Sequence, residues 1–378
     1  MAHICLVAGD PSGDAHAARL VEALRRLAPA WTFAGLGGPR MREAGVELLD
    51  ELTQTASIGP FDAIRHLGRF VRARRRLAAH LQARRVDGVV LVDFGDFNLP
   101  VIAPLAKRFG CRVVYYVSPQ IWAWGRFRLR WVRRYVDRML VLFPFEEQFY
   151  QRAGLPVTWV GHPLVDTATS SMTREQAQQR LGINPWRMTV GLLPGSRTHE
   201  ITRLLPLLLA TAARIAWHMP GVQFLIPKAP DVPPEAFNAL TANAKGLEVI
   251  VTENRLYECL QVMDGAIVAS GTATLEAALF EVPMAVVYRT SLLTYLMAKP
   301  LVRVPHIAMV NLLAGETVVP EFLQYRARPA RIARDVVALL RSDEQRARMR
   351  QGLRLVKERL GPPGAVERAA RAVLDMLS

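Results

Sequence analysis

The chain alternates short apolar runs, rich in β-branched residues, with stretches of helical periodicity from end to end. The runs of the first half are 3–8, 32–37, 88–93, 112–117, 138–143 and 157–160, and those of the second half are 188–193, 222–227, 247–251, 265–270 and 283–288. Continuous apolar runs suit strands that are covered on both faces, and their alternation with helices is typical of parallel sheets. The pattern therefore predicts an α/β fold.

The length of 378 residues favours two domains over one. The rhythm of strands and helices is interrupted by a polar, turn-rich stretch and then resumes. We predict a first domain over 1–165, a linker with a short helix over 166–187, a second domain over 188–328 and a basic helical tail over 329–378. Both domains are expected to be doubly wound and Rossmann-like, with a cleft between them.

The net charge of +15 comes almost entirely from arginine, since only five of the 48 basic residues are lysine. A nucleic-acid partner is not expected, because no motif of a nucleic-acid-binding fold is present. An anionic lipid surface and a phosphorylated substrate fit the charge equally well. A GC-rich coding bias would also produce it.

The three cysteines lie far apart in the sequence and fit neither a disulfide framework nor the spacing of a metal site, which favours a reducing compartment. The longest apolar tract is too short to span a bilayer and contains Arg214. A membrane-crossing protein is therefore not predicted.

Two strand–turn–helix junctions in the second half are typical of anion sites, because helix N-termini at the ends of parallel strands present bare N–H groups. The first junction reads LLPGSR. Gly195 would allow close approach of a ligand, Ser196 could cap or donate, and Arg197 offers a fork of donors to a phosphate. The alternative is an ordinary capped helix with a surface arginine.

The second junction reads ASGTATLE. Ser270, Gly271 and Thr272 could present hydroxyl and N–H groups to a diphosphate, and Glu276 could accept hydrogen bonds from a ribose diol. Small residues are common where helices begin, so this junction alone would carry little weight. Two such junctions in one domain favour a nucleoside diphosphate.

The corresponding junctions of the first half carry carboxylates. Asp10 follows the first strand in AGDPSGD, while Asp93, Asp96 and Asn98 follow a later strand in DFGDFN. Such carboxylates suit a general base that deprotonates a hydroxyl nucleophile, although each of them could equally be a helix cap or a turn residue. His162, near the end of the first domain, is interpreted as structural.

The chain contains no Asp-x-Asp pair of the kind that holds a metal-bound sugar nucleotide. We therefore predict no metal and no cofactor, with the charge of a leaving group balanced by helix dipoles and arginine. The stretch GLGGPR does not fit G-x-G-x-x-G, which disfavours a dinucleotide-dependent dehydrogenase.

Two stretches suggest contact with lipid. Residues 59–81 are predicted to form an amphipathic helix with Ile64, Leu67, Phe70, Val71 and Leu77 on one side and arginines elsewhere. The stretch SPQIWAWGRFRLRWVRR places tryptophans among arginines, as at a membrane interface or beside an acyl chain. Helices that simply pack on the sheet are the alternative.

The chain resembles the lipid-A-disaccharide synthases, a family of bacterial GT-B glycosyltransferases, over nearly its whole length. The stretches that carry the resemblance, in order, are VAGDPSGD, GLGGPRM, DFGDFN, YYVSPQIWAW, LFPFEEQFY, VGHPLVD, LLPGSR, ASGTATLEA, and NLLAG through PEFLQ. Asp10 stands where the family usually has glutamate, Glu316 and Thr317 stand where it often has Arg-Glu, and Gly125 precedes Arg126 where a basic residue is usual.

The resemblance implies an inverting transfer that joins UDP-2,3-diacylglucosamine to 2,3-diacylglucosamine 1-phosphate through a β-1,6 linkage and releases UDP. It implies Asp96 as general base, with Asp10 as second choice. The UDP-sugar would be held by Arg197, Ser196, Gly195, Ser270, Gly271, Thr272, Glu276, Asn311 and Gln324. The acceptor and lipid side would comprise Ser12, Trp122, Trp124 and Arg126.

The resemblance also implies a cytoplasmic enzyme, peripheral on the anionic inner membrane, and a homodimer built through the C-terminal segment. Other functions stay open. They are a GT-B relative with another acceptor, a UDP-N-acetylglucosamine epimerase of the same fold, and a basic binding module without activity.

Overall fold

The structure, a computed structural model, describes residues 2–53, 67–229, 246–290 and 304–377, with a few single positions at 232, 237, 240–241 and 295. These residues form two compact units, each built around one sheet. Unit 1 comprises Met1–Pro163 and Leu360–Ser378, and unit 2 comprises Leu164–Arg359.

Unit 1 is built on a sheet of seven parallel strands in the order β3-β2-β1-β4-β5-β6-β7. The strands are β1 (His3–Ala8), β2 (Thr32–Gly37), β3 (Glu47–Glu51), β4 (Gly88–Val92), β5 (Arg112–Tyr116), β6 (Arg138–Val141) and β7 (Val157–Trp159). All five residues of β4 are buried, as expected for a central strand covered on both faces.

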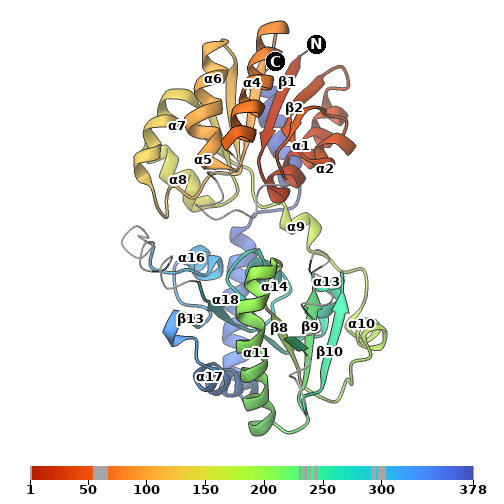
Figure 1. Cartoon of the computed structure of the whole chain (residues 1–378). Helices are drawn as coiled ribbons and strands as arrows, with labels where there is room; N and C mark the ends of the chain where they lie inside the picture. The colour runs from red at the N-terminus through yellow and green to blue at the C-terminus, as the bar shows by residue number, and fades with distance from the viewer. Residues whose placement is uncertain are drawn as a thin grey trace. The chain divides into compact units, whose positions relative to one another are not determined.

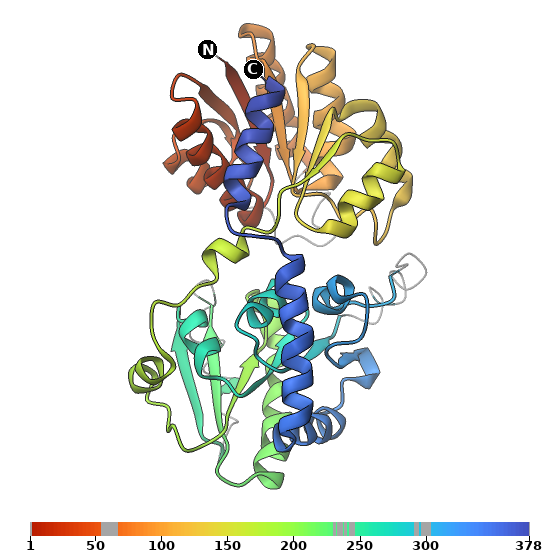
Figure 2. The same cartoon turned by 180° about the vertical axis from the view of Figure 1, so that it is seen from behind.

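Helices cover both faces of this sheet (Figures 1 and 2). Those described are α1 (Pro11–Leu27), α2 (Pro39–Glu43), α4 (Leu67–Ala83), α5 (Gly95–Phe97), α6 (Ala103–Arg108), α7 (Leu129–Tyr135), α8 (Pro144–Arg152) and α19 (Ala365–Leu377), with a π-helical turn at Asn98–Ile102 and a 3-10 turn at Arg126–Arg128. Helix α19 packs beside α1, and Arg26 and Glu367 form an ion pair of 2.8 Å between them.

Unit 2 is built on a sheet of six parallel strands in the order β10-β9-β8-β11-β12-β13. The strands are β8 (Thr189–Leu193), β9 (Gln223–Lys228), β10 (Val249–Glu253), β11 (Gly265–Ala269), β12 (Met284–Tyr288) and β13 (Glu321–Leu323). The helices are α9 (Leu164–Thr167), α10 (Arg174–Leu181), α11 (Thr198–His218), α13 (Leu256–Val262), α14 (Thr272–Leu279), α16 (Met309–Ala314), α17 (Pro329–Arg341) and α18 (Asp343–Arg359), with a 3-10 turn at Gln324–Arg326.

The eleven strands predicted from apolar runs are all present, each within about two residues of its expected limits. Two further strands escaped prediction. Strand β3 reads ELLDE and is only partly buried at the edge of its sheet, and β13 has three residues at the edge of the other sheet. An edge strand needs no continuous apolar run, because part of it faces water.

The predicted linker and tail are both incorporated into the two units. Helix α10 packs on α13, where Arg174 Nη2 lies 2.7 Å from Asp264 Oδ1. Of the basic tail, α17 packs on α11 and α18 on α14 in unit 2, whereas α19 belongs to unit 1. The two parts of the tail are divided at Leu360, just before the turn GPPG.

Helix α4 confirms the predicted helix only from Leu67 onward, since residues 54–66, Ile64 among them, lie outside the described residues. Its buried side chains are Ala73, Leu77, His80 and Leu81, while Leu67 is 61% and Val71 39% exposed. Leu67 and Val71, predicted to share one side of the helix with Leu77, therefore lie outside the buried face to which Leu77 belongs. At 3.6 residues per turn, both lie about a quarter turn or more from the buried face.

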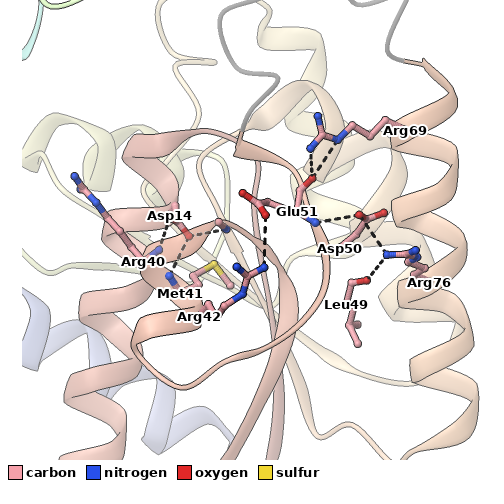
Figure 3. Close-up of polar contacts among 10 residues, drawn as sticks. Asp14, Arg40, Met41, Arg42, Leu49, Asp50, Glu51, Arg69 and Arg76 are labelled. Atoms are coloured by element: carbon pink, nitrogen blue, oxygen red, sulfur yellow. Dashed lines mark hydrogen bonds and ion pairs between the residues drawn. The ribbon is translucent and has the colours of Figure 1, made fainter. Parts of the chain in front are cut away.

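Arginines of α4 contact β3, as Figure 3 shows for Arg69 and Arg76. Arg69 Nη2 donates to the Glu51 carbonyl at 2.6 Å, and Arg76 Nη1 lies 3.4 Å from Asp50 Oδ1. These arginines therefore contribute to packing the helix on its sheet. No helix among the described residues is long and apolar enough to cross a membrane.

Candidate functional site

The two sheets share one topology, and in each the strand order reverses between two central strands. In unit 1 the reversal falls between β1 and β4, and in unit 2 it falls between β8 and β11. Ligands of open α/β sheets bind at the carboxyl ends of the strands that flank such a reversal. All four polar junctions singled out in the sequence follow these four strands. The pair of junctions in each unit therefore forms one candidate site.

The loop after β8 is held in shape by Glu200. Its Oε2 accepts from the N–H groups of Ser196 (3.2 Å) and Arg197 (3.4 Å), and Arg197 Nη1 donates to Oε1 at 3.3 Å. Gly195 has a φ of +107°, and a Cβ there would lie 2.4 Å from Glu200 Oε2. The glycine is thus required by the turn itself. Sequence reasoning missed Glu200, which lies in the first turn of α11.

The loop after β11 differs, because its glycine is not required by the protein. Gly271 has a φ of 162°, an extended conformation open to any residue, and a Cβ there would meet nothing within 4 Å. Thr274 Oγ1 donates to the Gly271 carbonyl at 2.7 Å and fixes the start of α14. The space above Gly271 leaves the first N–H groups of α14 open to an anion.

Glu276 is anchored by a tyrosine. Tyr257 Oη donates to Glu276 Oε1 at 3.1 Å, and its ring stacks on Phe280 with a centroid distance of 5.8 Å. Burial raises the pKa of Glu276 above its ordinary value, although the bond from Tyr257 opposes the rise. A half-buried carboxylate held in this way is a suitable acceptor for a pair of hydroxyl groups.

A cavity of about 700 Å³ joins the two loops of unit 2. Seven of the predicted donor-site residues line it, namely Gly195, Ser196, Arg197, Ser270, Gly271, Thr272 and Glu276. Among the lining residues that sequence reasoning missed are Lys228, Arg255 and Tyr257. Lys228 ends β9 with only 6% of its side chain exposed, and its Nζ lies 2.6 Å from Glu253 Oε1. The sequence offers one signal for Lys228, since this lysine directly follows an apolar run in a chain with only five lysines.

Asn311 and Gln324 lie apart from this cavity. Asn311 is fully buried, and its Nδ2 donates to the Val319 carbonyl (2.9 Å) and to Glu321 Oε1 (2.8 Å). Its Oδ1 accepts from the N–H groups of Val318 and Val319 at 2.9 Å each. The amide is thus fully engaged in fixing the segment before β13. The amide of Gln324 faces the backbone of Thr290, with both contacts at 3.2 Å once its oxygen and nitrogen are exchanged.

In unit 1, the loop after β1 is organised by two aspartates. Asp10 caps α1, since its Oδ1 accepts from the Gly13 N–H at 2.5 Å. Asp14, 2% exposed, accepts from the N–H groups of Gly38 (2.8 Å), Arg40 (3.0 Å) and Met41 (3.2 Å), as Figure 3 shows. This carboxylate joins the motif VAGDPSGD to GLGGPRM. Ser12 is exposed in the first turn of α1.

The loop after β4 contains two consecutive residues in the left-handed region, Asp93 (φ 48°) and Phe94 (φ 49°). Neither is glycine, so the turn is held against a local cost of about 1–3 kcal/mol per residue. Asn98 Nδ2 donates to the Asp93 carbonyl at 2.9 Å and supports the turn. Burial and the nearby charge of Asp10 raise the pKa of Asp93 to about 7. Asp93 therefore titrates near neutral pH.

Asp96 lies in α5 with 71% of its side chain exposed, and its Oδ1 lies 2.5 Å from Arg128 Nη2. The guanidinium carbon of Arg128 is 4.3 Å from the centre of the Trp124 ring. One arginine thus links the predicted base to the tryptophan–arginine stretch. Sequence reasoning missed Arg128 as this link.

The remaining acceptor-side residues differ in exposure. Trp122 is 8% exposed, and its Nε1 donates to Glu146 Oε1 at 3.0 Å. Burial raises the pKa of Glu146 to about 7. Arg126 is exposed in the 3-10 turn. His162 is buried, which lowers its pKa to about 3 and fits the structural role expected for it.

A family model described as lipid-A-disaccharide synthetase matches residues 4–373. The lipid-A-disaccharide synthase of Geobacter sulfurreducens is 45% identical over 374 residues, which are 99% of this chain and 97% of that protein. The one from Myxococcus xanthus is 43% identical with the same coverage.

Solved structures are similar in fold at low identity. The calicheamicin glycosyltransferase CalG4 has a TM-score of 0.63 at 16% identity, over 100% of this chain and 98% of that chain. A UDP-GlcNAc 2-epimerase from Neisseria meningitidis, bound to UDP-GlcNAc, has a TM-score of 0.65 at 12% identity, over 100% and 99%. The predicted α/β class with two doubly wound domains of the GT-B glycosyltransferase fold is confirmed.

Proposed function

The chain belongs to the lipid-A-disaccharide synthase family, and from this premise we propose that it joins UDP-2,3-diacylglucosamine to 2,3-diacylglucosamine 1-phosphate. The coarser statement follows from the family itself. The protein is a glycosyltransferase of lipid A biosynthesis that takes a sugar nucleotide and a lipid acceptor. The observation that carries the proposal is the cavity of unit 2, where seven predicted donor-site residues lie together.

UDP is proposed to bind this cavity with its diphosphate over Gly271, at the N-terminus of α14. The open space at the Gly271 Cβ position and the unsatisfied N–H groups of a helix start support this placement. Arg197 would exchange its contact with Glu200 for a phosphate oxygen, and Lys228 would add a second positive charge. Glu276, held by Tyr257, would accept from the ribose hydroxyls.

The proposed transfer is a single inverting displacement. The 6-hydroxyl of the acceptor attacks the anomeric carbon of the donor, the bond from that carbon to the UDP oxygen breaks, and Asp96 accepts the hydroxyl proton. The product is the β-1,6-linked disaccharide 1-phosphate, and UDP leaves with its charge balanced by Arg197 and the dipole of α14. The contact of Asp96 Oδ1 with Arg128 Nη2 at 2.5 Å would hold this carboxylate in position for the transfer. We propose that this step needs no metal.

The lipid acceptor also suggests where the enzyme works. We propose peripheral attachment to an anionic membrane surface through the tryptophan–arginine stretch. Trp124 and Phe127 are 37% and 59% exposed, with Arg128 stacked over both rings. Exposed aromatic rings among cations suit the interface between water and lipid.

The test is an assay of the purified protein with UDP-2,3-diacylglucosamine and radiolabelled 2,3-diacylglucosamine 1-phosphate, in detergent and EDTA, followed by thin-layer chromatography. A labelled product that requires both substrates, formed with one equivalent of UDP, is the expected result. UDP release without that product would reassign the acceptor. Conversion of a UDP-sugar without any acceptor would favour an epimerase, and no reaction by folded protein would contradict the proposal.

A further inference from the structure

Three side chains with metal-binding atoms meet near the amino end of β1 in unit 1. His3 and Cys5 are two residues apart on the strand and therefore point to the same face of the sheet. Helix α4 covers this face and brings His80 Nε2 to 2.8 Å from His3 Nε2. One ring nitrogen of each histidine and Cys5 Sγ all lie within 4.8 Å of one another.

The cluster is largely buried, and a neighbouring strand contributes a hydrogen bond to it. Cys5 is fully buried and His80 is 8% exposed. His3 Nδ1 lies 2.7 Å from Thr32 Oγ1, on the residue of β2 that is in register with His3. A hydrogen bond at Nδ1 fixes the ring orientation and leaves Nε2 for a ligand, as the outer partners of metal-bound histidines do.

We propose that His3, Cys5 and His80 bind a zinc ion. Two imidazoles and one thiolate are donors that zinc prefers, and a water molecule would complete a tetrahedron. The separation of 2.8 Å between the two Nε2 atoms fits a hydrogen bond between the rings, and the ion would replace that bond. Zinc–nitrogen bonds of about 2.0–2.1 Å put tetrahedral ligand atoms about 3.4 Å apart, so the rings must separate by roughly half an ångström.

The histidines and the cysteine differ in whether they must lose a proton before they can bind the ion. Burial lowers the pKa of His3 and of His80, so both rings are neutral and ready as ligands at neutral pH. Burial raises the pKa of Cys5 to about 12, so the ion must displace a proton from the thiol. The charged groups around the cluster are Glu47 and Asp87, which favour a cation, and Arg84, which opposes it.

The location of the site suggests a structural rather than a catalytic role for the ion. It would lie near the amino end of β1, whereas the candidate catalytic loop follows the carboxyl end of the same strand. An ion there would tie β1 to α4, the helix whose arginines already hold β3. The sequence spacing predicted no metal, because the third ligand lies on a distant helix.

The experiment uses the full chain, stripped of metal with a chelator and dialysed, and titrated with Co²⁺ and then Zn²⁺. We expect one Co²⁺ per chain with a sulfur-to-cobalt charge-transfer band and the visible bands of a tetrahedral site, displaced by Zn²⁺. Zinc should also raise the melting temperature, because it binds the folded chain. Cys5→Ala and His80→Gln should each abolish the band and the shift in melting temperature.

Two further variants keep the test sharp if a core substitution impairs folding. Thr32→Val, which removes only the partner of His3, should weaken zinc binding by about 10–100-fold in a folded protein. Cys259→Ala removes a buried thiol of unit 2 and should change nothing in the titration. Absence of the cobalt band in folded wild type, or binding that survives Cys5→Ala and His80→Gln unchanged, would overturn the proposal. The outcome is independent of the sugar-transfer assay.

Discussion

The two strand-order reversals have the same topology and opposite chemistry. Between β8 and β11, unit 2 offers small residues, hydroxyl groups, Arg197 and the buried Lys228 around one cavity. Between β1 and β4, unit 1 offers Asp10, Asp93 and Asp96. One arrangement is suited to holding an anion and the other to accepting a proton. The comparison shows that a fold fixes where a site lies, while the loop residues decide what it does.

The loops also differ in how they are held. In unit 2, Gly195 is demanded by its own turn, whereas Gly271 is free of any neighbour at the Cβ position. In unit 1, Asp93 and Phe94 adopt left-handed conformations without glycine, and Asn98 supports them. Strain at non-glycine residues is a common mark of catalytic loops, and open space beside a glycine is a mark of ligand approach.

The largest expected effect comes from removing the proposed base. Asp96→Ala should lower kcat by about 10²–10⁴-fold, the contribution typical of general base catalysis. UDP affinity should stay unchanged, because Asp96 belongs to unit 1 and the cavity to unit 2. Asp343→Ala is the matched control, since Asp343 is also exposed and paired with an arginine. A near-wild-type rate would move the base to Asp10 or Asp93.

The cationic side of the comparison is tested by Arg197→Ala. It should weaken UDP binding, measured by calorimetry, by about 1–3 kcal/mol, the range for loss of a charged hydrogen-bond partner. Arg197 caps helix α11, and Arg214 lies on the exposed side of that helix. The control Arg214→Ala should therefore leave UDP binding unaltered. Equal affinity of the Arg197 variant and the control would displace the donor site from the β8 loop.

The acidic loop should respond to pH through Asp93. Its pKa of about 7 lies above the unfolded value of about 4, so its contribution to stability is fully present below about pH 4 and is lost as pH rises to about 7. Asp93→Asn imitates the protonated form. It should therefore raise the melting temperature most at pH 8 and by clearly less at pH 5. An equal gain at both pH values would mean that folding does not raise the pKa of Asp93.

The smallest effect is expected from Tyr257→Phe, which removes the hydrogen bond to Glu276 and keeps the ring stacked on Phe280. UDP affinity should fall by about 0.5–1.5 kcal/mol, the usual net worth of one hydrogen bond. Tyr325→Phe, on an exposed tyrosine, provides the control. If both variants bind UDP as the wild type does, Tyr257 plays no part in holding Glu276 for the nucleotide.

Much of this architecture could be predicted from the sequence, because buried parallel strands require continuous apolar runs and the junction residues follow directly in the chain. Contacts that form only once the chain has folded could not be predicted in this way. Glu200 clamps the β8 loop, Arg128 pairs with Asp96 and Tyr257 anchors Glu276, and each contact depends on tertiary packing. Asn311 shows the converse, since its amide proves to be consumed by the backbone near Val319.

The most direct test of the central claim, that unit 2 binds UDP at the β8/β11 reversal, is UDP calorimetry on Gly271→Val. The extended φ and the absence of neighbours within 4 Å of a Cβ at this glycine predict an unchanged melting temperature. A side chain at that place would fill the space proposed for the diphosphate, so UDP affinity should fall at least tenfold. Wild-type UDP affinity in the folded Gly271→Val protein would contradict the account.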